Sequence, residues 1–422
     1  MYIERRLPER TVIAVRFRDV QRVVEKELES LEIISCHEHH LIPEEGKSVT
    51  LEYILQNSYV GWCGEEPGSS GPEKDLYLEK VGTNSYYRWL LFGLQRLYGF
   101  TGEIDAENWE NISSHIGKKH ASPEWYFTIL RKYGNISRAI LDAYWDPGSD
   151  NGHPESYSPT YRINALVMSH NREAKDHNGN NAWDLFAPYG IKPTSFSEYL
   201  EAVEALLAVK KNEGCVALKS ALAYDRTLAF ACPNKEDAEA VFDTTVDMHS
   251  TEARAFQDYM FHFILEQAGT LGLPVQCHVG LGKLQGSNPM NLLPMIERYP
   301  RNKFVLFHGG YPWVHEIGGL LHNCDNVYAD LVWLPLISPT AAIRGLHEWI
   351  EVARTSEKIT WGGDCWTPEE TYGAVLALRH VVARVLSEKI TEGYFGYRRA
   401  FELARQIFSK NACRLYGFQL EE

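Results

Sequence analysis

Residues 31–40 read Leu31-Glu32-Ile33-Ile34-Ser35-Cys36-His37-Glu38-His39-His40, an apolar run that ends in three histidines and a carboxylate. The run predicts a buried strand that delivers metal ligands. Alternate side chains of a strand share one face, so His37 and His39 can point at one ion while Glu38 points away. Imidazole nitrogens suit zinc and similar divalent ions. An isolated His-x-His can equally be an exposed polar turn, so the interpretation depends on further ligands elsewhere.

The composition is that of an acidic protein, because 42 Lys and Arg stand against 56 Asp and Glu and the formal charge is −14. This balance argues against nucleic acid or an anionic membrane as a partner, and we expect a small-molecule substrate. Residues 1–6 lack the apolar core of a signal peptide, and no apolar segment approaches the roughly 20 residues of a membrane span. We therefore expect a cytoplasmic protein. The eight cysteines lack paired short spacings, so no disulfide framework is expected.

Short apolar runs alternate with longer helical patterns along the chain, which is typical of β/α units. The eight predicted strands are residues 32–36, 138–143, 163–168, 215–218, 274–277, 304–307, 327–330 and 359–361. Amphipathic stretches at 196–210 and 253–268 are long enough for crossover helices. Eight such units favour a (β/α)8 TIM barrel over an open doubly wound sheet, which would also need a glycine-rich phosphate loop after the first strand.

The interval between the first two predicted strands is too long for a single β/α unit. About a hundred residues separate the first two predicted strands, against roughly 30 per unit in a minimal barrel. We therefore predict a single domain of residues 1–422 with a helical insertion at about residues 41–135. Helical patterns at 84–100, which is rich in aromatic residues, and at 123–133 lie inside it. These helices are expected to cover the catalytic mouth, although the aromatic residues could instead pack in the insertion's own small core.

Side chains that can bind a metal or carry a proton follow four further predicted strands. They are Lys219 after the fourth, His278 after the fifth, His308 after the sixth and Asp364 after the eighth. Active sites of (β/α)8 enzymes lie at the C-terminal ends of the strands, so these side chains should converge although they are far apart in the sequence. One such histidine would usually be an ordinary loop residue. Together with His37 and His39, the set predicts a metal centre.

This ordered set resembles the pattern of the amidohydrolase superfamily, which has His-x-His after strand 1, Lys or Glu after strand 4, His after strands 5 and 6, and Asp after strand 8. A finer resemblance rests on Leu218-Lys219-Ser220-Ala221-Leu222-Ala223-Tyr224, Tyr161-Arg162-Ile163, Leu97-Tyr98-Gly99-Phe100 and Asn411-Ala412-Cys413-Arg414-Leu415-Tyr416-Gly417. These strings are similar to the amidohydrolase-related (amidohydrolase 2 type) metal-dependent hydrolases. That group includes the N-terminal domain of FluG-type proteins and lies near uronate isomerases and ACMSD-type decarboxylases.

The resemblance implies a divalent metal site, with zinc the expected metal and one or two ions. His37 and His39 would hold the more buried ion, with Asp364 as a further ligand. His278 and His308 would hold the second ion.

Lys219 has a special place in this resemblance, because a protonated ammonium group has no lone pair for a cation. In the related binuclear enzymes this lysine is carboxylated and bridges both ions, so N6-carboxylysine is expected at Lys219. The alternative is a neutral or cationic lysine that binds a substrate carboxylate beside a single metal.

The expected activity is hydrolysis of a small amide, ester or lactone that carries a carboxylate. Metal-activated hydroxide would attack the carbonyl, Asp364 would shuttle the proton, and Lys219 would belong to the catalytic machinery. The alternative is a single-metal decarboxylase or uronate-isomerase-like enzyme on the same scaffold. A homo-oligomer is expected, since such barrels often associate.

Four residues are candidates for substrate binding. Arg226 could bind a substrate carboxylate bidentately, or pair with a loop acid instead. Arg88 and Tyr86 on the predicted inserted helix are further candidates, and His170 after the third predicted strand could line the mouth. His40 is expected to support the site or to lie at the surface rather than to ligate, since its parity opposes that of His39.

Overall fold

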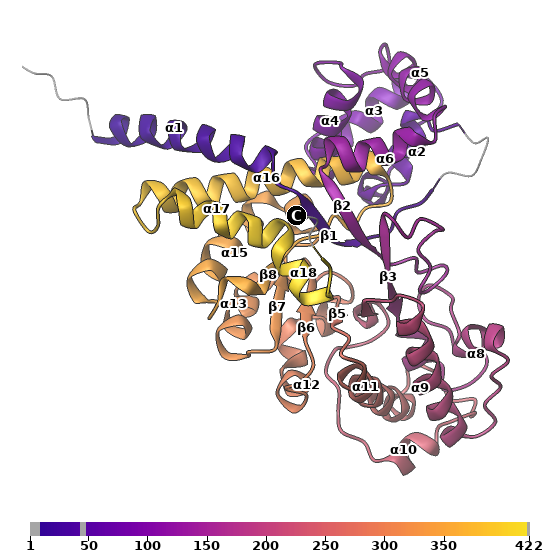
Figure 1. Cartoon of the computed structure of the whole chain (residues 1–422). Helices are drawn as coiled ribbons and strands as arrows, with labels where there is room; N and C mark the ends of the chain where they lie inside the picture. The colour runs from indigo at the N-terminus through magenta and orange to yellow at the C-terminus, as the bar shows by residue number, and fades with distance from the viewer. Residues whose placement is uncertain (1–8, 43–47, 420–422) are drawn as a thin grey trace, which may run out of the picture.

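The barrel consists of eight parallel strands whose order in the sheet follows the chain (Figure 1). The computed structural model describes residues 9–42 and 48–419. The strands are β1 (Ile33–Glu38), β2 (Ile136–Leu141), β3 (Tyr157–Arg162), β4 (Ala217–Ser220), β5 (Val275–Cys277), β6 (Phe304–Leu306), β7 (Val327–Asp330) and β8 (Ile359–Thr360). The main-chain N–H of Cys36 donates to the carbonyl of Trp361 at 2.9 Å, which brings β1 against the end of β8. The predicted (β/α)8 barrel is confirmed.

The prediction of the third strand at residues 163–168 is wrong. The strand is Tyr157–Arg162, and Asn164–Met168 form the short helix α7. A short apolar run cannot be assigned to strand or helix by periodicity alone, and this one is a buried helical turn. The true strand contains Pro159, which usually argues against a central strand, although its carbonyl accepts the N–H of Val216 at 3.0 Å. The corrected bounds place Arg162 at the end of a strand.

Helices surround the barrel, and several of them begin at a capping serine or threonine side chain. The longer ones after the third strand are α9 (Phe196–Asn212), α11 (Thr251–Leu271), α13 (Val314–Asn323), α15 (Pro339–Val352), α16 (Pro368–Thr391) and α17 (Tyr397–Arg405). The shorter ones are α8 (Ala182–Phe186), α10 (Lys235–Glu239), α12 (Leu293–Arg298), α14 (Leu334–Ile337) and α18 (Asn411–Tyr416). The Ser250 side chain accepts the N–H of Ala253 at the start of α11, and Gly272, with a φ of 68°, ends it.

The first helix, α1 (Glu9–Glu29), precedes the first barrel strand in the sequence and packs on α16 (Figure 1). Its buried side chains Val20, Val24 and Leu28 recur every fourth residue, so they form one stripe of the helix. Residues 1–6, on which the expectation about a signal peptide rests, lie outside the described residues. No helix in the described part of the chain combines the length and the apolar character that a membrane span needs.

Five α-helices of the described residues lie between β1 and β2 and gather at one side of the barrel (Figure 1). They are α2 (Leu51–Gln56), α3 (Gly71–Val81), α4 (Ser85–Tyr98), α5 (Trp109–His120) and α6 (Glu124–Thr128). They share a core separate from that of the barrel, to which Tyr87 and Tyr98 of the aromatic pattern belong. Gly93 of α4 lets the helix lie directly against α16, since a Cβ there would be 3.2 Å from the carbonyl of Glu369. Residues 43–47 of the predicted insertion lie outside the described residues.

Candidate active site

The C-terminal ends of the strands bring three of the predicted metal ligands together. His37 lies in β1, His39 directly follows it, and Asp364 lies in the loop after β8. The Asp364 Oδ1 atom is 3.4 Å from Nε2 of His37 and 3.3 Å from Nε2 of His39. One ligand atom of each residue lies within 4.8 Å of the others, and all three residues are buried. This is the spacing of groups that can share one cation.

Glu38 holds the loop that carries Asp364. Its buried carboxylate accepts the N–H of Gly363 at 3.1 Å and that of Cys365 at 2.9 Å, on either side of Asp364. Asp364 has a φ of 65°, a left-handed conformation that aspartate tolerates better than most residues. Gly363 has no room for a side chain, since a Cβ there would lie 2.4 Å from Oε1 of Glu38. The residue that points away from the ligand pair therefore positions the third ligand.

The imidazole of His37 is in the state that a metal ligand needs. Both of its ring nitrogens are buried and have no hydrogen-bond partner among the described residues. Burial lowers the pKa of His37 well below its ordinary value and the charge of Lys219 adds to the shift, so the ring is neutral with a free lone pair. Buried polar atoms without a partner are rare in proteins. These orphaned nitrogens, with His39 and Asp364 beside them, fit a divalent cation.

His278 and His308 lie beside this cluster and contact each other. His278 directly follows β5, and His308 lies in a sharp turn after β6 with a φ of 61°. Nε2 of His308 is 2.8 Å from Nδ1 of His278, and Nδ1 of His308 is 3.9 Å from Oδ2 of Asp364. Burial lowers the pKa of both histidines well below the ordinary value. Two neutral imidazoles therefore border the cluster of His37, His39 and Asp364.

Lys219, in β4, is a buried lysine with an unusual environment. It is 1% exposed, and its Nζ lies 4.0 Å from the centre of the Phe307 ring. Among the described residues, none forms a hydrogen bond with this Nζ. Burial lowers the pKa of Lys219 to about 8, although the charges of Asp364 and Asp142 oppose the shift. A substantial neutral fraction is therefore available near physiological pH.

An arginine–aspartate pair at two neighbouring strand ends is missing from the sequence-based candidates. Asp142 directly follows β2, and Arg162 is the last residue of β3. Nη2 of Arg162 lies 2.5 Å from Oδ2 of Asp142, which is 3.6 Å from Nε2 of His37. Burial alone would raise the pKa of Asp142, but the charge and hydrogen bonds of Arg162 together with the charges of His39 and Lys219 lower it below the ordinary value. Site residues of such a barrel are expected at the ends of the strands. The predicted strands 138–143 and 163–168 do not end at Asp142 or Arg162, so neither residue became a candidate.

A cavity of about 250 Å³ opens over these groups. Lys219, Arg162, His39, His278 and Asp364 contribute polar atoms to its wall. The remaining lining residues are Tyr59, Trp62, Tyr144, His177, Asn178, Ala221, Tyr224 and Trp366.

Tyr59 connects the aromatic wall to the ligand cluster, because its hydroxyl donates to Oδ2 of Asp364 at 2.6 Å. Tyr59 and Trp62 come from a short 3₁₀ helix, Tyr59–Cys63, between β1 and β2. Trp62 remains 56% exposed at the mouth of the cavity. No local sequence motif points to either residue, since their contact with Asp364 and Trp366 arises only from tertiary packing.

A family model described as Amidohydrolase matches residues 143–418, which is more than half of the chain. The chain belongs to the amidohydrolase family. The predicted resemblance is confirmed, and the protein is an enzyme of the amidohydrolase fold.

Among curated proteins, this amidohydrolase is similar to protein fluG of Emericella nidulans, with 34% identity over 149 residues. That match covers 34% of this chain and 17% of fluG. It is also similar to the uronate isomerase of Lachnoclostridium phytofermentans, with 23% identity over 214 residues that cover 48% of this chain and 44% of the isomerase. The chain therefore matches less than half of the length of each of these relatives.

Among solved structures, the uronate isomerase of Thermotoga maritima overlays on this amidohydrolase with a TM-score of 0.75. The sequences are 18% identical, and the overlay covers 94% of this chain and 97% of the isomerase. At this identity the likeness supports the barrel fold and leaves the reaction open.

The four predicted substrate-binding residues lie outside the lining of the amidohydrolase cavity as the structure describes it. Tyr86 packs against the cavity wall, since its ring centre is 5.2 Å from that of Tyr59. Arg88 pairs with Glu103 at 2.8 Å on the surface. Nε2 of His170 lies 3.0 Å from the carbonyl of Val246.

Arg226 lies in a different pocket and forms an ion pair with Asp258 at 2.5 Å. His40 is buried behind the ligand pair. Its Nδ1 lies 2.8 Å from the Tyr157 hydroxyl and its Nε2 lies 2.8 Å from the Thr371 hydroxyl. Both nitrogens of His40 are therefore occupied by protein groups.

Proposed function

We propose that this amidohydrolase is a metal-dependent hydrolase that cleaves the amide, ester or lactone bond of a small substrate bearing a carboxylate. The supporting observation is the cluster of His37, His39 and Asp364, of which His39 and Asp364 line one cavity together with the cationic guanidinium of Arg162. Groups that can hold a divalent ion and groups that attract a carboxylate thus border the same small space.

His37, His39 and Asp364 would hold the ion, and zinc fits a set of two imidazoles and a carboxylate. A divalent ion bound there would lower the pKa of water and polarise a carbonyl oxygen. The aromatic residues around the ligands would exclude bulk water from the reacting groups.

Asp364 is the proposed proton carrier. Burial alone would raise its pKa, but the hydrogen bond and charge of His39, helped by Lys219 and Tyr59, lower it. Asp364 is therefore an anion at neutral pH. Its carboxylate can accept a proton from the attacking water and return it to the leaving nitrogen or oxygen. Tyr59 orients this carboxylate through its hydrogen bond to Oδ2.

We further propose that Lys219 carries a carbamate. The neutral amine nitrogen would attack the carbon of carbon dioxide and lose one proton as the N–C bond forms. A pKa of about 8 supports this, because part of the amine population is neutral near physiological pH. The carbamate oxygens would join His278 and His308 as ligands of a second ion. Without this modification, Lys219 would bind the substrate carboxylate beside a single ion.

Isomerisation of a sugar acid is the second candidate. It is supported by the similarity to the uronate isomerase of Lachnoclostridium phytofermentans over 48% of this chain. Arg162 and Lys219 would suit the carboxylate of a sugar acid as well as that of an amide or lactone substrate.

The two candidates can be separated by assaying protein purified without chelator. One set of substrates would be N-acyl amino acids and carboxylate-bearing lactones, and the other would be uronates. Hydrolysis that disappears in Asp364→Asn and persists in Asp325→Asn would support the proposal, since Asp325 pairs with Arg354 far out on the surface. Isomerisation of uronates without hydrolysis of any compound in the first set would overturn it.

The carbamate has its own test. Elemental analysis should give two metal ions per chain, and native mass spectrometry should show the added mass of one carbon dioxide. Both signals should be lost in Lys219→Met. One ion per chain together with an unmodified lysine would overturn the carbamate and leave the single-metal version of the hydrolase.

A further inference from the structure

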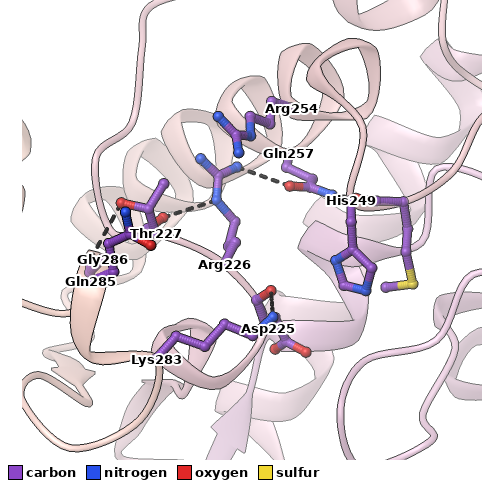
Figure 2. Close-up of a pocket in the computed structure, with 10 residues that line it drawn as sticks. Asp225, Arg226, Thr227, His249, Arg254, Gln257, Lys283, Gln285 and Gly286 are labelled. Atoms are coloured by element: carbon purple, nitrogen blue, oxygen red, sulfur yellow. Dashed lines mark hydrogen bonds between the residues drawn. The ribbon is translucent and has the colours of Figure 1, made fainter.

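The structure contains a second pocket, of about 470 Å³ (Figure 2). Its walls come from residues 225–227 after β4, residues 283–286 after β5, and the start of α11 with the residues before it. Tyr224 lines the catalytic cavity and Asp225 lines this pocket, so the two spaces share the segment after β4. Arg226, the sequence-based candidate for binding a carboxylate, lies in this second pocket.

Cations dominate the wall of the second pocket. Arg226, Arg254 and Lys283 line it, together with His249. Asp225 is the acid among the described lining residues, and its carboxylate is committed elsewhere. Its Oδ1 accepts the main-chain N–H of His177 at 2.8 Å.

The other carboxylate oxygen of Asp225, Oδ2, accepts the side-chain N–H of Asn164 at 2.6 Å and lies 2.9 Å from Nδ1 of His177. Asp225 is therefore turned toward the catalytic cavity, which His177 lines. A cationic pocket is notable in a chain whose formal charge is −14.

The guanidinium of Arg226 is held in the pocket wall by contacts with neighbouring residues. Its Nη2 lies 2.5 Å from Oδ1 of Asp258, its Nη1 donates to Gln257 at 3.1 Å, and its Nε donates to the carbonyl of Thr227 at 3.0 Å. The guanidinium is buried, and Asp258 compensates its charge. The net charge of the pocket must therefore come from the other cations.

Arg254 and Lys283 supply that charge, and neither forms an ion pair with another described residue. Arg254 forms no hydrogen bond or ion pair with any residue in the described part of the chain, and Figure 2 shows its guanidinium close to that of Arg226. Burial lowers the pKa of Arg226, Asp258 opposes the shift, and the charge of Arg254 adds to it. Nζ of Lys283 donates to the main-chain carbonyl of Asp225 at 2.6 Å, which is a neutral acceptor. Like charges held together in this way are stabilised by a bound anion.

We propose that this pocket binds a doubly charged oxyanion, such as a phosphate group. The guanidinium of Arg254 can donate two parallel hydrogen bonds to such a group, and Lys283 adds a point charge. The pocket has room for more than one phosphate, so the group can be free in solution or part of an organic molecule. A chain of contacts from Lys283 through Asp225 to His177 links the bound anion to the wall of the catalytic cavity.

Calorimetric titration with inorganic phosphate and with glycerol phosphate tests the site on the whole metal-loaded protein in chloride buffer. Phosphate should bind the wild type, and the affinity should fall at least about tenfold in Arg254→Ala and in Lys283→Ala, because each removes a charge-assisted hydrogen bond. Arg398→Ala is the matched control, since Arg398 is an exposed arginine on α17. Arg254 has no partner to lose among the residues that the structure describes, so its variant should fold like the wild type.

The two ligands distinguish the sources of the anion. Equal affinities would assign the site to a free anion, and tighter binding of glycerol phosphate would assign it to an organic phosphate. Absence of binding to the wild type, or equal affinity in Arg254→Ala, would overturn the proposal. So would binding that is lost in Asp364→Asn and kept in Arg254→Ala, because the anion would then occupy the metal centre. Catalytic activity is not the readout, so this test is independent of the proposed hydrolase.

Discussion

Two buried arginine–aspartate pairs of the same length lie in two different pockets of this amidohydrolase. Arg162 pairs with Asp142 and Arg226 pairs with Asp258, each at 2.5 Å. Asp142 also lies 3.6 Å from Nε2 of His37, at the ends of the barrel strands. The second pair joins a loop to α11, away from the metal ligands. The comparison teaches that the position relative to the strand ends, and not the pair itself, decides which pair lies beside His37, His39 and Asp364.

The surroundings of the two pairs differ as well. Around Arg162 the neighbouring cation is Lys219, whose pKa burial lowers to about 8, so its charge is partly removed. Beside Arg226 stands Arg254, a permanent cation without a partner among the described residues. One pocket can therefore combine neutral ligands with a proton carrier, whereas the other offers only positive charge.

The largest effect is expected from Asp364→Asn, which removes the carboxylate that we propose as the proton carrier. Turnover should fall by about 10²- to 10⁴-fold, the range of general acid–base catalysis, because an amide cannot accept the proton. Metal content should stay close to that of the wild type, since the amide oxygen can still face the ion. Steady-state kinetics and elemental analysis measure the two quantities, and Asp325→Asn is the surface control. Near-parental turnover would remove Asp364 from the mechanism.

The two ion pairs can be compared directly with Arg162→Met and Arg226→Met. Each variant leaves a buried carboxylate unpaired, so the free energy of unfolding should fall by about 3–5 kcal/mol in both. Only Arg162→Met should also lower turnover, because only Arg162 lines the catalytic cavity. Urea unfolding and kinetics give the two readouts. If the methionine variant does not fold, Arg162→Lys can replace it in the kinetic measurement. Lysine keeps the positive charge but cannot form two parallel hydrogen bonds to a carboxylate. Equal turnover in the two methionine variants would contradict a role for Arg162 that Arg226 does not share.

A strand-end carboxyl that forms no ion pair with the described residues should respond to pH in the opposite sense from Asp142. Burial raises the pKa of Asp330, at the end of β7, to about 7. Its unfolded pKa is about 3.9, so protonated Asp330 contributes its full stabilisation below about pH 4 and loses it as the pH rises to about 7.

Asp330→Asn should therefore gain stability relative to the wild type across that window, by about 2–4 kcal/mol in total. The asparagine can keep the contacts of Asp330 with the N–H of Val332 and the hydroxyl of Thr360. Urea unfolding of both proteins at several pH values measures the difference. A difference that does not change with pH would show that Asp330 titrates normally.

The smallest effect is expected from Trp62→Ala at the mouth of the catalytic cavity. Trp62 is 56% exposed, so the free energy of unfolding should change by less than about 1 kcal/mol. The KM for a hydrolysed substrate should rise several-fold while kcat stays near the parental value, because the indole borders the cavity away from the metal ligands. Trp145→Ala is a suitable control, since Trp145 is 41% exposed and lies outside the described cavity wall. An unchanged KM would exclude Trp62 from substrate binding.

Much of the candidate site could be predicted from the sequence because its residues sit at the ends of apolar runs. His37, His278 and Lys219 each directly follow a predicted strand, at residues 32–36, 274–277 and 215–218. Arg162 and Asp142 were not predicted as site residues. β3 contains polar residues and a proline, so it does not have the pattern of a buried strand, and the apolar run after it forms a helix. An error of a few residues in the bounds of a strand was enough to hide them.

The sequence by itself determined the barrel and the family and predicted the candidate ligands, since each depends on local patterns in a fixed chain order. Only the tertiary structure decided which cations face which cavity. Arg226 follows Lys219 by seven residues, yet it turns into another pocket because Asp258 of α11 and Gln257 hold it there. Glu38 points away from the ligands and still positions Asp364 through the N–H groups on either side of it. Such contacts join segments that are distant in the chain, and no local pattern encodes their distances.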